Sequence, residues 1–342
     1  MAVSRPEGTA QRTLFDAVVR PVWLLLVVVV VAFSLFEVPL TWQYVPLALS
    51  VLLLGLPHGA IDHLVPARLD GQTADLRTML GVGALYAVVG GAYLLVWFLS
   101  PVVAFVFFIL MTWAHWGQGD VHALVALFDA EHLDGRLKKA TTAIVRGGMP
   151  MLVPLVAFPE QYRFVAETLI ERFAASAAVL DPVFTADARL ALGVGFGTLV
   201  VGTLAAGAED GGWKTDGWRL DVTETGLLAV FFATVPPVFA IGLYFCFWHA
   251  LRHVSRLVLL DPTSVRSLEA GRLRPAILRF GRDAAPLTLA SILILAAFYL
   301  VVPVQPGNVA ESVGLYLVLI AVLTLPHVLV VALMDRKQGI WS

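Results

Sequence analysis

Long uncharged apolar segments alternate with shorter polar segments along this chain. Seven of the apolar runs hold about 20 residues or more, which is the length that an α-helix needs to cross the hydrocarbon core of a bilayer. These runs are residues 42–61, 79–99, 101–119, 190–208, 225–251, 284–310 and 312–334. The pattern predicts an all-α fold, a polytopic transmembrane helix bundle in which residues 1–342 form a single integral membrane domain.

A further apolar run, residues 22–36, follows Arg5, Arg12 and Arg20 and looks like the start of a secretory signal peptide. The residues after it, 37–41, offer no cleavage site made of small side chains. We therefore expect this run to stay in the protein as its first membrane helix, which makes about eight spanning helices.

Residues 147–159 form a shorter apolar segment of a different kind. The segment has 13 residues, is bounded by Arg146 and Glu160, and contains Pro150 and Pro154. Because it is too short to span the bilayer and proline interrupts helical hydrogen bonding, we expect a re-entrant or broken segment here.

The loop charges predict how the chain is oriented, because lysine and arginine concentrate in the cytoplasmic loops of membrane proteins. Basic residues cluster in segments 62–78, 129–146 and 252–283 and after residue 334. All of these share one side if residues 147–159 do not cross the bilayer. The sequence thus predicts a multi-pass protein of the cell membrane with both termini cytoplasmic, and it places the turn at Glu209 and Asp210 outside.

The composition agrees with a membrane protein that has the lipid bilayer as a partner. Hydrophobic residues make up 59% of the chain and charged residues 14%, whereas a soluble domain carries about a quarter charged residues. The net charge of −2 gives no basic field for nucleic acid, so no nucleic-acid partner is expected. The lone cysteine, Cys246, excludes an intrachain disulfide framework and a cysteine-rich metal site.

Histidines inside the apolar segments carry the candidate chemistry. In the predicted topology, five of them fall near one depth in the cytoplasmic half of the membrane, and they are His58, His115, His249, His253 and His327. An ionisable side chain within a bilayer is costly and usually functional. Imidazole is also a common metal ligand, so the shared depth favours a metal site.

His249 and His253 are four residues apart, so both side chains lie on one face of a helix. Zinc proteases hold their metal with the same spacing, although the glutamate of H-E-x-x-H is missing here. An isolated pair of this kind is more often two hydrogen-bonded residues near a helix end. The intramembrane residues His58 and His115 at the same depth favour metal ligation by all four histidines.

Asp62 lies four residues after His58, on the same helical face. Its carboxylate either accepts the distal ring N–H of a ligating imidazole, which would fix the tautomer, or pairs with Arg68 or His63 at the membrane surface. The sequence leaves both readings open. His63 points away from His58 and is a weaker candidate ligand.

Other residues near the histidines are candidates for lining the site or for holding a ligand in place. His327 follows Pro326, and Asp120 is a second carboxylate that could contact a ligand. The aromatic candidates are Trp113, Trp116, Tyr244 and Trp248. Aromatic side chains at helical spacing often serve only packing. His122 and His132 border a charged loop, and we expect both to be solvated.

The ligand type narrows the choice of metal ion but does not determine it. Sites made of imidazoles suit iron(II), zinc, copper and nickel. Four imidazoles around octahedral iron leave two positions for dioxygen, whereas zinc with four histidines would be closed and structural.

Several motifs together resemble the Brp/Blh family of membrane-embedded β-carotene 15,15′-dioxygenases, which includes the bacteriorhodopsin-related proteins of haloarchaea. They are Pro57-His58-Gly59-Ala60-Ile61-Asp62-His63, His115-Trp116-Gly117, Tyr244-Phe245 followed by His249 and His253, and Pro326-His327. The resemblance extends roughly from the apolar run at residues 42–61 to the C-terminus.

The resemblance implies an activity and a cofactor. It implies Fe(2+) held by His58, His115, His249 and His253, with β-carotene and O2 as substrates and two molecules of retinal as products. It also implies a functional link to a microbial rhodopsin, and it gives His63 and His327 no firm role.

Two other classes of protein use histidines within the membrane. Membrane di-iron desaturases carry an H-x-x-H-H box, which this chain lacks. A proton-coupled transporter or a haem-binding electron carrier, with His115 and His249 as relay or axial ligands, is the alternative function. Neither class accounts for the P-H-G-x-x-D-H motif.

Overall fold

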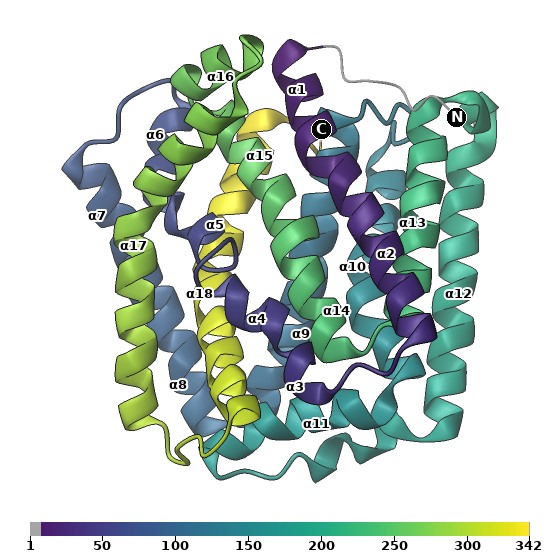
Figure 1. The fold of residues 1–342 in the computed structure, drawn as a ribbon, viewed down its shortest axis with the longest axis vertical. Helices are drawn as coiled ribbons and strands as arrows, with labels where there is room; N and C mark the ends of the chain where they lie inside the picture. Colours follow the sequence, from purple (N-terminus) through teal and green to yellow (C-terminus); the bar gives the residue numbers. More distant parts are fainter. Residues whose placement is uncertain (1–7, 342) are drawn as a thin grey trace.

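The computed structural model describes residues 8–341, and this part of the chain is an all-helical bundle (Figure 1). Seven of its helices are long and apolar enough to cross a membrane by length and composition. They are Thr9–Leu35, Leu76–Leu99, Pro101–Leu127, Arg136–Ala157, Ala186–Ala208, Leu273–Val301 and Val309–Gln338. The all-α transmembrane bundle is confirmed, and about eight predicted spans agree with this number. Arg5 lies outside the described residues.

The first half of the chain contains α1 (Thr9–Leu14), α2 (Arg20–Leu35), α3 (Leu40–Gln43), α4 (Val45–Ser50), α5 (Pro57–Ala60), α6 (Val65–Leu69), α7 (Leu76–Leu85), α8 (Gly91–Leu99), α9 (Pro101–His122), α10 (Arg136–Ala157) and α11 (Pro159–Ile170). The second half contains α12 (Ala186–Ala208), α13 (Asp216–Thr234), α14 (Pro237–Leu243), α15 (Leu251–Leu259), α16 (Pro262–Glu269), α17 (Leu273–Val301) and α18 (Val309–Gln338). Short π-helical and 3-10 turns join several of these helices, including Tyr244–Ala250 between α14 and α15.

The predicted span 42–61 is broken into the short helices α3, α4 and α5. Pro46 and Pro57 each stand in the first turn of a new helix, because proline lacks the N–H that a helix interior requires. Between α4 and α5 the Gly55 N–H donates to the Ser50 carbonyl, and a Cβ at Gly55 would lie 2.6 Å from that oxygen. The broken membrane segment is therefore residues 42–61 and not residues 147–159, where it was predicted.

The prediction of a re-entrant segment at residues 147–159 is wrong. Residues 147–157 belong to α10, which starts at Arg136 and keeps both Pro150 and Pro154 inside the helix. The prediction treated the Arg146 charge as the end of an apolar run. Arg146 is instead fully buried and paired with Glu224 of α13. The helix therefore extends through this charged residue and does not begin after it.

The predicted span 225–251 is also divided, between α13 and α14. Helix α13 ends before Val235 and Pro236, which agrees with the rule that helices stop ahead of a proline. After this break, residues 237–259 continue as one helical run through α14, the π-helical turn and α15.

The turn after α12 lies beside the 128–135 loop, and its predicted place on the opposite side is wrong. A Cβ at Gly207 would meet the His132 ring, and a Cβ at Gly217 would meet the Ala130 backbone. Four helical passes, α10, α12, α13 and residues 237–259, thus follow this loop where two were predicted (Figure 1). Both numbers are even, so the basic segments still share one end of the bundle.

We call this end the basic end, and it holds α1, α16, the 128–135 loop and the C-terminus of α18 (Figure 1). The Thr13 hydroxyl of α1 donates to the Leu268 carbonyl of α16, and Arg136 donates to the Trp341 carbonyl. Helix α11 lies at the opposite end. Assignment of the basic end to the cytoplasm stays a prediction.

Candidate metal centre

The five intramembrane histidines come from four segments that all run toward the basic end (Figure 1). They are α5, α9, residues 237–259 and α18, and each brings its histidines to the same level of the bundle. Their imidazole rings form one cluster, in which contacting ring centroids are 4.8–5.7 Å apart. All five side chains are buried.

The ring nitrogens of this cluster are largely free of protein partners. Within the described residues, the Nε2 atoms of His115, His249, His253 and His327 are buried without a hydrogen bond. A buried polar atom normally has a partner, because leaving it unsatisfied costs about 1–3 kcal/mol. Unpartnered imidazole nitrogens suit a metal ion, which requires neutral imidazoles with a free lone pair.

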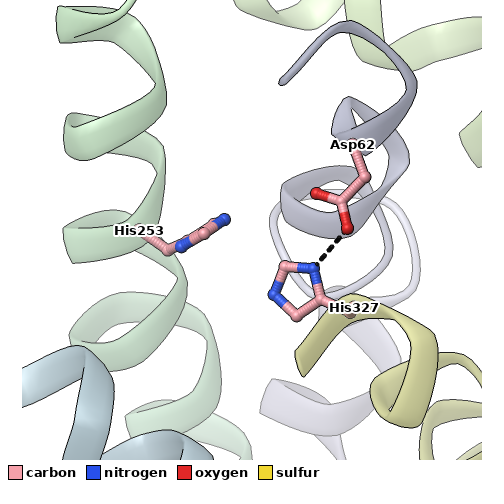
Figure 2. Close-up of side chains that lie close together, drawn as sticks. All are labelled: Asp62, His253 and His327. Atoms are coloured by element: carbon pink, nitrogen blue, oxygen red, sulfur yellow. Dashed lines mark hydrogen bonds and ion pairs between the residues drawn. The ribbon is translucent and has the colours of Figure 1, made fainter. Parts of the chain in front are cut away.

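Asp62 approaches the cluster through His327 (Figure 2). The His327 Nδ1 donates to the Asp62 carboxylate at 2.7 Å, and the Tyr86 hydroxyl donates to the same oxygen at 2.6 Å. Potential ligand atoms of Asp62, His253 and His327 lie within 4.8 Å of one another. A carboxylate that binds one imidazole nitrogen leaves the other, here Nε2, free to hold a metal.

The reading of Asp62 as a partner of Arg68 or His63 is therefore wrong, and the imidazole that Asp62 contacts is His327 and not the neighbouring His58. The Nδ1 of His58 contacts the Leu54 carbonyl at 3.0 Å, not Asp62. Arg68 pairs with Asp283, and the Nδ1 of His63 contacts the Ala60 carbonyl, so neither bonds to Asp62. The half-buried His63 takes no part in the contacts of the cluster.

The other predicted lining residues divide into two groups. Trp116 packs against the His249 ring with centroids 5.6 Å apart, and it shares a pocket with the histidines. Tyr244 stacks on Trp248, and the Trp248 Nε1 donates to Asp120 at 3.0 Å. The Trp113 Nε1 donates to the Ile144 carbonyl of α10. Trp116 therefore lines the pocket, whereas Trp113, Tyr244 and Trp248 do not line it and pack between the surrounding helices.

Asp120 belongs to a buried charge cluster that sequence reasoning did not find. Glu224 accepts hydrogen bonds from Arg146, Arg252 and Trp23, and Asp120 lies 3.4 Å from Arg146 and 3.7 Å from Arg252. Charges this deep need partners, since desolvation is costly. The signal in the sequence was the acidic pair Asp221 and Glu224 ahead of an apolar run.

The expected solvation of His122 and His132 is wrong. Both side chains are about 5% exposed. The Nε2 of His132 lies 3.1 Å from Asp221 of α13, and Gly212 in the turn after α12 lies close to the same histidine.

Two glycines let α9 and α10 approach closely enough to hold His115. A Cβ at Gly117 would lie 1.9 Å from the Ala143 carbonyl oxygen. A Cβ at Gly147 would lie 2.0 Å from the Trp113 carbonyl oxygen. No other residue type fits at these contacts without moving one helix.

An apolar pocket, partly open to the outside, leads to the histidine cluster. Three helices line it with residues at helical spacing. On α9 the stripe is Phe105, Phe108, Ile109, Thr112 and His115; after α13 it is Val238, Ile241, Phe245 and His249; and on α18 it is Val313, Leu317, Ile320 and Thr324, one turn before His327. The α18 stripe alone extends over roughly 17 Å at 1.5 Å per residue.

The fold and the site together define a class of protein. It is a polytopic helical membrane protein with a buried histidine centre at the end of an elongated apolar pocket. The family described as beta-carotene 15,15′-dioxygenase matches residues 49–335. The chain belongs to this family of enzymes, as the motifs in the sequence suggested.

Curated relatives agree with the family. The chain is 44% identical over 300 residues to a probable beta-carotene 15,15′-dioxygenase Blh of Halobacterium salinarum, covering 88% of this chain and 86% of the relative. It is 31% identical over 320 residues to a probable beta-carotene 15,15′-dioxygenase Brp of the same species, covering 90% and 87%. No solved structure gives a significant match.

Proposed function

We propose that this protein cleaves β-carotene with O2 at its central 15,15′ double bond and releases two molecules of retinal. One dioxygen molecule balances the replacement of one carbon–carbon double bond by two aldehydes. The observation that carries the proposal is a cluster of five buried imidazoles, of which His58, His115 and His249 line an apolar pocket. The names of the relatives supply the substrate.

The residues fit Fe(2+), which would activate dioxygen when bound. His58, His115, His249 and His253 stay the proposed ligands, and the Asp62 hydrogen bond adds His327 to them. The unpartnered Nε2 atoms of His115, His249, His253 and His327 support the inclusion of these four residues, and nitrogen ligands suit iron(II). Asp62 and Tyr86 would fix the His327 ring so that its Nε2 faces the centre.

The pocket would position the polyene, since a hydrocarbon offers no polar group for recognition. Contacts along three stripes of side chains hold an extended molecule in one direction and bring one of its bonds to the histidines. The apolar walls would also exclude water from the reacting centre. The depth of the pocket would thereby choose the bond that is cleaved.

The test is to express the chain in bacteria that accumulate β-carotene and to quantify retinal by chromatography. We expect retinal together with loss of carotenoid colour, and iron in the purified protein. The His249→Ala variant should insert into the membrane but form no retinal. The His63→Ala variant is the matched control, because His63 is outside the cluster, and it should keep its activity.

Other outcomes would reject the proposal. Retinal formation by His249→Ala at the normal rate would contradict the assignment of His249 as a metal ligand. An absence of retinal from membrane-inserted, iron-containing protein would reject the substrate, and a Soret band would favour a haem-binding carrier. The link to a microbial rhodopsin as the acceptor of retinal stays a prediction.

A further inference from the structure

Three threonines line the apolar pocket, and one of them differs from the others. The Thr168 hydroxyl donates to the Phe164 carbonyl at 2.7 Å, and the Thr324 hydroxyl donates to the Ile320 carbonyl at 2.7 Å. This bond to the carbonyl four residues earlier is the usual arrangement for threonine in a helix. Within the described residues, the Thr112 hydroxyl oxygen is buried without any partner, although the side chain is only 4% exposed.

Thr112 lies at the histidine end of the pocket. It is three residues before His115 on α9, so both side chains share one face of the helix. The Tyr44 hydroxyl is also unpartnered, but Tyr44 packs with Leu47 and Val238, against Val313 near the start of α18. Val313 is roughly 20 Å from His327 along α18 at 1.5 Å per residue, so Tyr44 is far from the centre.

The substrate cannot satisfy the Thr112 hydroxyl, because a hydrocarbon has no hydrogen-bond acceptor of this kind. In central cleavage, an acceptor first appears in this part of the pocket when oxygen joins the polyene beside the histidines. The new acceptor is the aldehyde oxygen of the nascent product.

We infer that the Thr112 hydroxyl donates a hydrogen bond to the aldehyde oxygen as retinal forms in the pocket. The inference rests on the proposed function and assigns Thr112 a role in the same reaction. The bond is absent in the enzyme–substrate complex and present late in the reaction. Interactions of this kind raise kcat and leave the binding of the substrate unchanged.

The experiment compares Thr112→Val with Thr112→Ser and uses Thr288→Val as the matched control, because the Thr288 hydroxyl donates to the Ala284 carbonyl on α17 and Thr288 does not line the pocket. Valine keeps the shape of threonine and removes the hydroxyl. We expect Thr112→Val to lower kcat by roughly 10-fold, as loss of one neutral hydrogen bond does, with KM for β-carotene unchanged. Thr112→Ser should keep most of the activity, and Thr288→Val should match the wild type.

A second readout is independent of turnover. Added all-trans-retinal should bind the Thr112→Val protein several-fold more weakly than the wild type, whereas Thr288→Val should not change its affinity. Equal kcat and equal retinal affinity in Thr112→Val would overturn the inference. A parallel loss of activity in Thr112→Ser or Thr288→Val would also overturn it, because packing would then explain the effect. A wild-type protein that forms no retinal would reject the proposed function instead.

Discussion

The Asp62 carboxylate accepts hydrogen bonds from the His327 ring at 2.7 Å and from the Tyr86 hydroxyl at 2.6 Å on the same oxygen. The other carboxylate oxygen is buried without a partner. Asp62 thus joins the P-H-G-x-x-D-H motif to the last helix of the bundle, and it decides which nitrogen of His327 faces the cluster.

We expect Asp62→Asn to lower iron content and retinal formation by about 10- to 100-fold, the usual effect of losing a carboxylate that orients a metal-bound imidazole. The measurement is metal analysis of the purified protein together with the cellular retinal assay. Asp70→Asn is the control, because Asp70 forms a largely exposed pair with Lys337. An unchanged iron content in Asp62→Asn would show that His327 does not depend on this bond.

Glu224 should be important for stability, because it neutralises two buried guanidinium groups. We expect Glu224→Gln to destabilise the protein by roughly 3–5 kcal/mol, the effect of removing one partner from a buried ion pair. Thermal unfolding in detergent measures this difference. Asp181→Asn breaks the partly exposed pair with Arg163 and should cost no more than about 1 kcal/mol. Similar melting temperatures for the two variants would contradict the prediction.

The contact between α9 and α10 predicts that Gly147 tolerates no side chain. A Cβ 2.0 Å from the Trp113 carbonyl oxygen would force the helices apart, and overpacking of this kind costs about 1–3 kcal/mol or more. Gly147→Ala should therefore lower both the melting temperature and retinal formation. Gly195→Ala on α12 is the control, since a Cβ there meets nothing within 4 Å. Equal stability of the two variants would count against the close helix contact.

Labelling with a membrane-impermeant maleimide can test the topology. The native cysteine, Cys246, is 1% exposed and should react little, so single cysteines can be introduced directly. We expect Glu131→Cys and Trp213→Cys to react only after cell lysis, and Ser176→Cys to react in intact cells. Reaction of Trp213→Cys in intact cells would place the turn after α12 on the outer side.

The apolar runs predicted the bundle well because the bilayer sets the length of a helix. They failed at Arg146, since the charge that ended a run in the sequence is balanced by Glu224, 78 residues away. They also failed at residues 42–61, where length alone did not reveal the breaks at Gly55 and Pro57. Local sequence carries no information about such distant partners.

For the site, the spacing of His249 and His253 and the shared depth of the histidines identified the side chains that the structure brings together. The partners of Asp62 and Asp120 could not be predicted, because each is fixed by packing between segments far apart in the chain. The role of the histidines as ligands stays a prediction that the metal analysis tests. Thr112 was missed because an unpartnered hydroxyl is visible only in the folded protein.

The hydrogen bond between Asp62 and His327 joins positions that are 265 residues apart. Its two ends therefore leave the ribosome at very different times, and the imidazole cluster is incomplete until the final helix has been inserted and docked. A premature stop anywhere before residue 327 would produce a chain that lacks one wall of the pocket and one imidazole of the centre. Full activity therefore requires that synthesis has passed residue 327.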